Sequence, residues 1–154
     1  MDPSEIRSAT YRFEVPAIAT AEGLVNPKSK WVDSFINNQN FPFRKLEPGK
    51  KLVEFLDFTR KTDWKEVLVV AKSFGLKIPT YEDALCFNAY SPDCPGGFLI
   101  FPHEQVEYLF DDRVICLCRY GEFRLVQMTQ LFDPKGIKKI TFNPGTRLAF
   151  LGSP

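Results

Sequence analysis

The residues best suited to chemistry in this chain are one cysteine in a glycine-rich loop and the only histidine. Cys94 lies in the loop 92–97, which contains two prolines and two glycines, and His103 follows it closely. A thiol becomes nucleophilic when a neighbouring base takes its proton, and glycine N–H groups can stabilise an oxyanion. Cys94 and His103 therefore predict, as one alternative, a cysteine-dependent enzyme. Proline and glycine are also what a helix-to-strand turn requires, and this structural interpretation is the favoured one.

Metal binding is a second chemistry to consider, because the chain has enough soft ligands for it. Zinc modules, however, carry paired C-x-x-C spacings, which this sequence lacks. Cys116 and Cys118 alternate with Ile115 and Leu117, so they are expected as small core residues on one face of a strand. We predict no metal site and no cofactor. The potential ligands of the chain are Cys86, Cys94, Cys116, Cys118 and His103.

A helix-turn-helix-like segment lies at residues 71–85. It resembles the helix-turn-helix of bacterial winged-helix repressors at Ala71, Gly75, Thr80, Ala84 and Leu85. This likeness covers about a tenth of the chain and implies nucleic-acid contacts from Lys72, Lys77, Thr80 and Tyr81. The second helix would begin with Glu82 and Asp83, whose carboxylates repel phosphates. A structural helical hairpin is the favoured interpretation, with nucleic-acid binding and protein binding as alternatives.

Aromatic and basic residues interleave in a second segment that contains Trp31, Phe41, Phe43, Arg44 and Lys45. Such residues can anchor a protein interface, or they can stack on bases and neutralise phosphates. The alternative is a helix with a solvated lysine face and Trp31 in the core. For Phe41 and Phe43 we predict that one ring anchors the loop in the core while the other is partly exposed beside Arg44.

The elements that must position these residues follow from periodicity and turn sequences. A strand is expected at residues 11–15, and helices are expected at 30–36, 50–61, 63–75 and 80–90. Strands are expected at 98–101, 106–110, 113–120, 122–132, 137–142 and 147–151. The predicted fold is α+β, with a helical amino-terminal half packed on a five- to six-stranded antiparallel meander formed by the carboxy-terminal third. We expect a single domain over residues 1–154, with a helical subregion at about 26–92 and the antiparallel sheet at about 97–151.

Composition narrows the classes of function. Twenty basic and nineteen acidic residues give a net charge of +1, so long-range attraction to nucleic acid or anionic lipid is not expected. The sequence predicts no signal peptide, no membrane span and a reduced, cytoplasmic setting. Our leading hypothesis is a non-enzymatic cytoplasmic module that binds another protein, with an edge strand at 147–151 that could also pair with a second copy. A nucleic-acid-binding protein is the first alternative, and the cysteine enzyme is the second.

Overall fold

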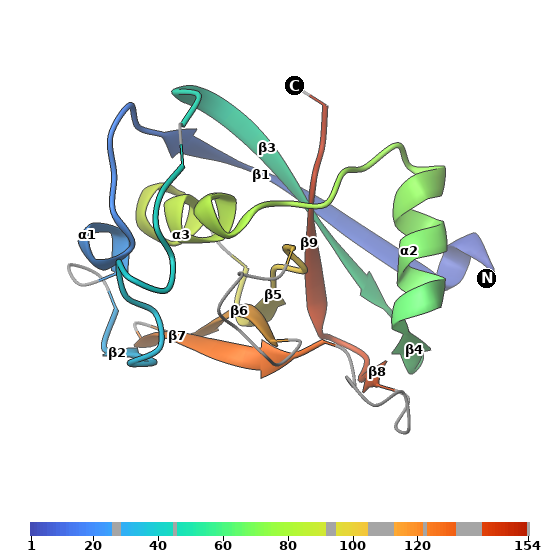
Figure 1. The fold of residues 1–154 in the computed structure, drawn as a ribbon. Helices are drawn as coiled ribbons and strands as arrows, with labels where there is room; N and C mark the ends of the chain where they lie inside the picture. Colours follow the sequence, from blue (N-terminus) through green and yellow to red (C-terminus); the bar gives the residue numbers. More distant parts are fainter. Residues whose placement is uncertain are drawn as a thin grey trace.

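The structure is a computed structural model, and it describes residues 1–25, 29–44, 46–91, 95–104, 113–121, 123–131 and 140–153. Strands make up 40% of the described residues and helices 22%. The helices are η1 (Pro3–Glu5), α1 (Ala21–Val25), α2 (Trp64–Ser73) and α3 (Tyr81–Tyr90). The strands are β1 (Ile6–Val15), β2 (Trp31–Val32), β3 (Gly49–Phe58), β4 (Thr62–Asp63), β5 (Gly97–Ile100), β6 (Arg113–Tyr120), β7 (Phe123–Gln130), β8 (Thr141–Phe142) and β9 (Arg147–Leu151). Figure 1 shows their arrangement.

Seven of these strands form one mixed sheet in the order β1-β3-β9-β5-β6-β7-β2. The pairs β5–β9 and β2–β7 are parallel, and the remaining neighbours are antiparallel. The two short strands β4 and β8 pair separately. The edge strands differ greatly in length, because β1 has ten residues and β2 has two.

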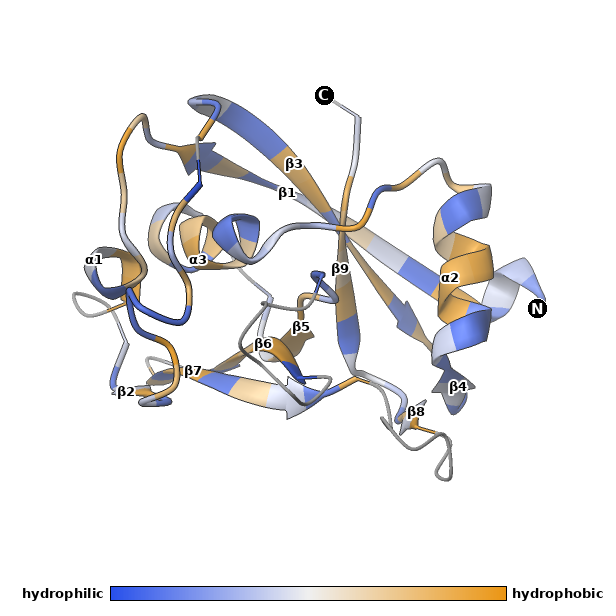
Figure 2. Ribbon diagram, in the orientation of Figure 1, coloured by the Kyte–Doolittle hydropathy of each residue, from blue (hydrophilic) through white to orange (hydrophobic). Residues whose placement is uncertain are grey.

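Both faces of the sheet are covered at its centre, where alternate side chains along the strands enter two different hydrophobic cores. The first core lies between the sheet and helices α1 and α3, and it contains Phe55, Leu117 and Ala149. The second core lies on the opposite face against α2, and it contains Leu56, Cys116 and Phe150. Figure 2 shows the corresponding alternation of hydrophilic and hydrophobic residues along β1 and β3. Helices α2 and α3 therefore lie on opposite faces of the sheet.

Both long helices begin and end as their sequences predict. Asp63 and Glu66 form a reciprocal capping box at the start of α2, and Thr80 and Asp83 form one at the start of α3. Helix α2 ends at Ser73, and Gly75 follows two residues later with a φ of 68°, a conformation that glycine adopts without strain. There Gly75 N–H donates to Lys72 O and Leu76 N–H donates to Ala71 O, which satisfies two terminal carbonyls.

The predicted arrangement of the fold is wrong, although the chain does combine helices with a sheet. The carboxy-terminal third forms no separate antiparallel meander, because the strand 147–151 is inserted between β3 and β5. It is therefore a central strand, and the edge at which we expected pairing with a second copy is already occupied. Turn sequences indicate which consecutive strands are adjacent, as in the β6–β7 hairpin, but they contain no information on where a later strand inserts.

Two of the predicted helices are also wrong. Residues 50–61 contain most of β3, and residues 30–36 contain β2 followed by turns. The apolar residues of β3 do not alternate because both faces are covered: Val53 and Phe55 enter the first core, while Leu56 and Phe58 enter the second. That spacing resembles a helical pattern. The expected strand 106–110 and most of the expected strand 137–142 lie outside the described residues.

The segment 71–85 does not pack as a helix-turn-helix. Ala71 lies in the second core and Ala84 in the first, so the sheet separates the two helices. The linker between them passes the end of β9, where Lys77 and Leu151 exchange two backbone hydrogen bonds of 3.0 and 2.8 Å. In Figure 1 this linker crosses in front of β9. In addition, every residue of α3 except Tyr90 is buried, so α3 has no face with which to enter a groove.

Candidate functional site

Four exposed aromatic rings lie together on the face of the sheet that also carries α2. Paired residues on adjacent strands point to the same face, and the registers place Trp31 beside Leu125, Leu125 opposite Cys118, and Cys118 opposite Phe98. Leu125 and Cys118 belong to the second core, which identifies the face. We call Trp31, Phe98, Tyr120 and Phe123 the aromatic patch.

The remaining two rings of the aromatic patch occupy the next row. Tyr120 pairs with Phe123 across the β6–β7 hairpin, two residues beyond Cys118 and Leu125. Phe98 and Tyr120 meet edge to face with centroids 5.9 Å apart. Each of the four side chains is about half exposed, between 45% and 56%. Large apolar groups in such a contiguous arrangement mark interaction surfaces, whereas scattered exposed rings do not.

A cation lies on one ring of the aromatic patch. Lys30 Nζ lies 4.9 Å from the centroid of the Phe123 ring, in a cation–π contact. The strands β2, β5, β6 and β7 contain no Asp or Glu, and their three arginines alternate with the patch residues, so Arg113, Arg119 and Arg124 point to the opposite face of the sheet. Arg119 is buried, and its guanidinium lies over the Phe87 ring of the first core. Among the described residues, Lys30 is therefore the cation in direct contact with the rings of the aromatic patch.

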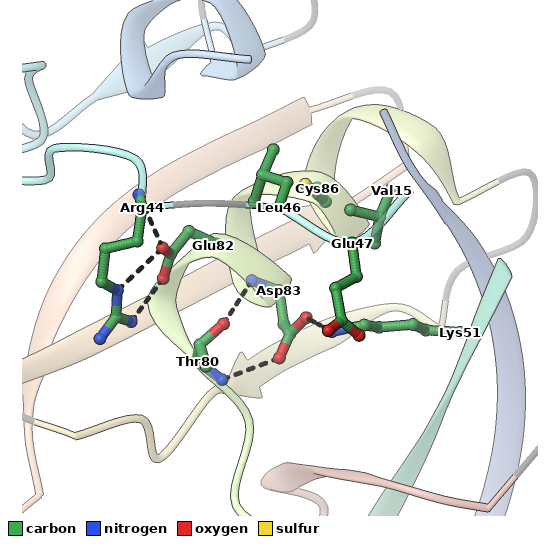
Figure 3. A pocket seen from close by; sticks show the side chains of 9 residues that line it. All are labelled: Val15, Arg44, Leu46, Glu47, Lys51, Thr80, Glu82, Asp83 and Cys86. Atoms are coloured by element: carbon green, nitrogen blue, oxygen red, sulfur yellow. Dashed lines mark hydrogen bonds and ion pairs between the residues drawn. The ribbon is translucent and has the colours of Figure 1, made fainter. Parts of the chain in front are cut away.

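A second candidate is a charged pocket of about 340 Å³ beside the first turn of α3, shown in Figure 3. Two ion pairs form its polar wall. Arg44 Nη2 donates to Glu82 Oε1 at 2.6 Å, and Arg44 Nε donates to Glu82 Oε2 at 3.0 Å. Lys51 Nζ donates to Asp83 Oδ1 at 2.8 Å. The carboxylates are 6% and 3% exposed, whereas the Arg44 and Lys51 side chains are 51% and 36% exposed.

The groups of the charged pocket are occupied with one another. Asp83 Oδ2 also accepts the Thr80 N–H at 2.9 Å, and Glu104 Oε1 accepts from Arg44 Nη1 at 2.6 Å. The hydrogen bonds to Glu82 and Glu104 raise the pKa of the Arg44 guanidinium above its usual value. Burial raises the pKa of the Cys86 thiol to about 12, so that thiol is protonated at neutral pH. The charged pocket thus holds a stable ionic arrangement with no free acid, base or nucleophile among these groups.

The segment that carries Phe41, Phe43 and Arg44 is attached to α3 through Tyr81. The Phe41 and Tyr81 centroids lie 5.3 Å apart, the Tyr81 hydroxyl donates to Pro42 O, and the Arg44 guanidinium lies 4.8 Å from the centre of the Tyr81 ring. Phe41 is fully buried and Phe43 is half-buried, which confirms the predicted division between the two rings. These residues line the first core, so they do not share a face with Trp31.

The other residues singled out in the sequence are dispersed. Lys72 and Lys77 are exposed, Thr80 is half-buried, and Tyr81 is 5% exposed. Lys45 and Cys94 lie outside the described residues. Cys116 and Cys118 share the buried second core, as predicted, with their Sγ atoms 3.9 Å apart.

His103 is buried with both ring nitrogens engaged. Its Nε2 accepts the Ile115 N–H at 3.0 Å, which places the proton on Nδ1, and Nδ1–H donates to Glu104 O at 2.6 Å. Burial lowers the pKa of His103 to about 4. A neutral imidazole held in this way ties the end of β5 to β6, and it has no free nitrogen with which to take a proton from a thiol.

Three members of the aromatic patch, Phe98, Tyr120 and Phe123, were not predicted from the sequence. The predicted hairpin at Gly121 already places Tyr120 next to Phe123, and that was the available signal. To place Phe98 and Trp31 beside these two rings, one must know the order of four strands in the sheet. Within the described part of the chain, no three His, Cys, Asp or Glu side chains converge to hold a metal, and no helix is long and apolar enough to cross a bilayer. Comparison with family models, curated proteins and solved structures gives no match.

Proposed function

We propose that this chain is a non-enzymatic, cytoplasmic binding module that contacts another protein through the aromatic patch. The observation that carries the proposal is the convergence of four half-exposed rings from four adjacent strands on one face. Aromatic side chains supply large contact areas at small entropic cost, and they dominate interface hot spots. The Lys30 ammonium on the Phe123 ring favours a partner segment that combines apolar anchors with Asp or Glu.

A single-stranded nucleic acid is the second candidate, and the Lys30–Phe123 contact is the observation that favours it. Bases stack on exposed rings, and nearby cations neutralise phosphates. A protein partner is preferred. Among the described residues, Lys30 is the cation in contact with the rings, and the chain as a whole carries a net charge of only +1. Phosphate-driven binding needs several cations along the path of the strand.

To test the proposal, short peptides that bind the protein are selected from a display library. Each enriched peptide is then labelled with a fluorophore and titrated with the protein, and fluorescence anisotropy measures its binding. Enriched peptides are expected to combine aromatic or aliphatic residues with Asp or Glu. Phe123→Ala and Tyr120→Ala should each weaken binding about tenfold or more, as loss of a hot-spot ring does. Phe74→Ala is the matched control, because Phe74 is 48% exposed but lies at the end of α2.

Two results would overturn this proposal. Enriched peptides that bind Phe123→Ala and Tyr120→Ala as tightly as the unaltered protein would show that the rings do not form the contact. The parallel arm uses labelled oligothymidine about 15 nucleotides long, within the site size of one single-strand-binding fold. If this probe binds, weakens steeply with added salt and depends on the same rings, the second candidate replaces the first.

A further inference from the structure

The outer edge of β1 is the second feature of the sheet that invites a partner. β1 pairs with β3 in one continuous register over ten residues, and it contains no proline, no glycine and no bulge. Among the described residues no strand pairs with its other edge. Proteins usually protect an exposed edge with a proline, a bulge or a very short strand, and the opposite edge follows this rule because β2 has only two residues.

The side chains near the end of β1 have a charge pattern that complements itself. Arg12 and Glu14 are exposed, point to the same face and flank the buried Phe13. Within the described chain neither of them forms an ion pair. If a second copy of β1 lies antiparallel with Phe13 on the two-fold axis, Arg12 of each copy faces Glu14 of the other. Tyr11 then faces Val15, and pairing ends at Pro16, which has no N–H to donate.

A hollow lies beside the same residues. It has a volume of about 320 Å³ and is lined by Arg12, Phe13, Glu14, Lys50 and Tyr90. Tyr90, at the end of α3, is 42% exposed and adds an aromatic surface next to the strand. Three residues that line the hollow, Arg12, Phe13 and Glu14, are also residues that the antiparallel arrangement pairs.

We propose that β1 pairs with β1 of a second copy of this chain, centred on Phe13, and extends the sheet across a two-fold axis. The surface is separate from the aromatic patch, since β1 and β2 form opposite edges of the sheet. Five paired residues and the Tyr90 side chain of each copy bury less surface than a standard interface, which buries about 1,600 Å². The dimer is therefore weak and concentration-dependent.

Charge reversal tests both the pairing and its register. Sedimentation velocity over a concentration series is run on the unaltered chain, on R12E, on E14R and on the double variant R12E/E14R. Each single reversal places like charges opposite each other at two symmetric positions and is expected to weaken the dimer about tenfold. The double variant restores opposite charges and is expected to recover the original affinity. An equimolar mixture of R12E and E14R is expected to form a heterodimer tighter than either variant alone.

The altered side chains are exposed, so these variants should fold, and far-UV circular dichroism checks that they do. Lys65→Glu is the matched control, because Lys65 is an exposed lysine on α2 and is not among the residues that line the hollow beside Arg12 and Glu14. Hydrogen exchange provides a second measurement, in which amides of residues 11–15 become more protected as the concentration rises. A chain that is monomeric at every concentration would overturn the proposal. The proposal would also be overturned if neither single reversal changed the affinity of the dimer, or if the double variant did not restore that affinity.

Discussion

Replacing Arg44 by alanine should destabilise the protein far more than its exposure suggests. The Arg44 side chain is 51% exposed, but its partner Glu82 is only 6% exposed and accepts two side-chain hydrogen bonds from the guanidinium, at 2.6 and 3.0 Å. After the substitution the Glu82 carboxylate is still buried. From residue 44 it keeps only the hydrogen bond of the backbone N–H, at 3.1 Å. It also removes the guanidinium that lies 4.8 Å from the Tyr81 ring centroid.

The magnitude follows from the burial of the two partners. Removing one partner of a fully buried ion pair costs about 3–5 kcal/mol. Water reaches the open side of Arg44, which lowers the expected loss to about 2 kcal/mol of unfolding free energy. For a chain of this size, that corresponds to a decrease of about 1 M in the urea midpoint. Arg44→Lys should recover only part of the loss, because an ammonium cannot match the bidentate geometry.

Urea unfolding followed by circular dichroism measures the effect, and Arg7→Ala provides the matched comparison. Arg7 Nε bonds Asp57 Oδ1 at 2.9 Å, but Arg7 is 60% exposed and Asp57 is 13% exposed, so its loss should cost about 0.5 kcal/mol or less. In the double variant Arg44→Ala/Glu82→Gln, the cost should fall below the sum of the single costs. Equal losses for Arg44→Ala and Arg7→Ala would refute the reasoning, since burial of Glu82 would then have no energetic consequence.

Two further predictions concern buried groups that titrate. The pKa of His103 is lowered from 6.5 to about 4, so the unfolded chain binds the extra proton, and unfolding free energy should fall by about 3 kcal/mol between pH 6.5 and 4. His103→Gln should flatten this dependence in urea titrations at a series of pH values, and an unchanged slope would contradict the assignment. In a Cys94→Ser background the buried thiols Cys86, Cys116 and Cys118 should not react with a thiol reagent at neutral pH until the protein is unfolded. Rapid reaction of the folded protein would show that at least one of them is accessible.

The parts of the fold that the sequence predicted are those governed by neighbouring residues. The caps Asp63 and Thr80 specify the two long helix starts, because a side-chain oxygen satisfies an N–H only three residues away. Gly121 likewise specifies the hairpin that joins β6 and β7. The split between Phe41 and Phe43 also followed from local composition, since a polar segment can bury only part of its aromatic content.

The parts that were missed depend on residues far apart in the chain. β3 could be recognised as a strand only by knowing that helices cover both faces of the sheet, since its apolar residues then lose their alternation. The aromatic patch combines Trp31 with Phe98 and Phe123, and nothing in the local sequence of any of them indicates that β2, β5 and β7 lie within four adjacent strands. Exposure of a ring is therefore a property of the assembled sheet, and a local sequence pattern does not predict it.

The central position of β9 has a consequence for how the chain folds during synthesis. β3 and β5 have no direct pairing, and both are held by a strand at residues 147–151 that the ribosome makes after them. Until that strand emerges, no strand pairing among the described residues joins β1 and β3 to the β5–β6–β7 segment, and the apolar faces that β9 covers are open to chaperones or to other nascent chains. The sheet closes through contacts of high sequence separation, which makes its final step slow. A chain truncated before residue 147 should therefore lack the pairing that links β3 to β5, and it should be more sensitive to protease than the intact chain.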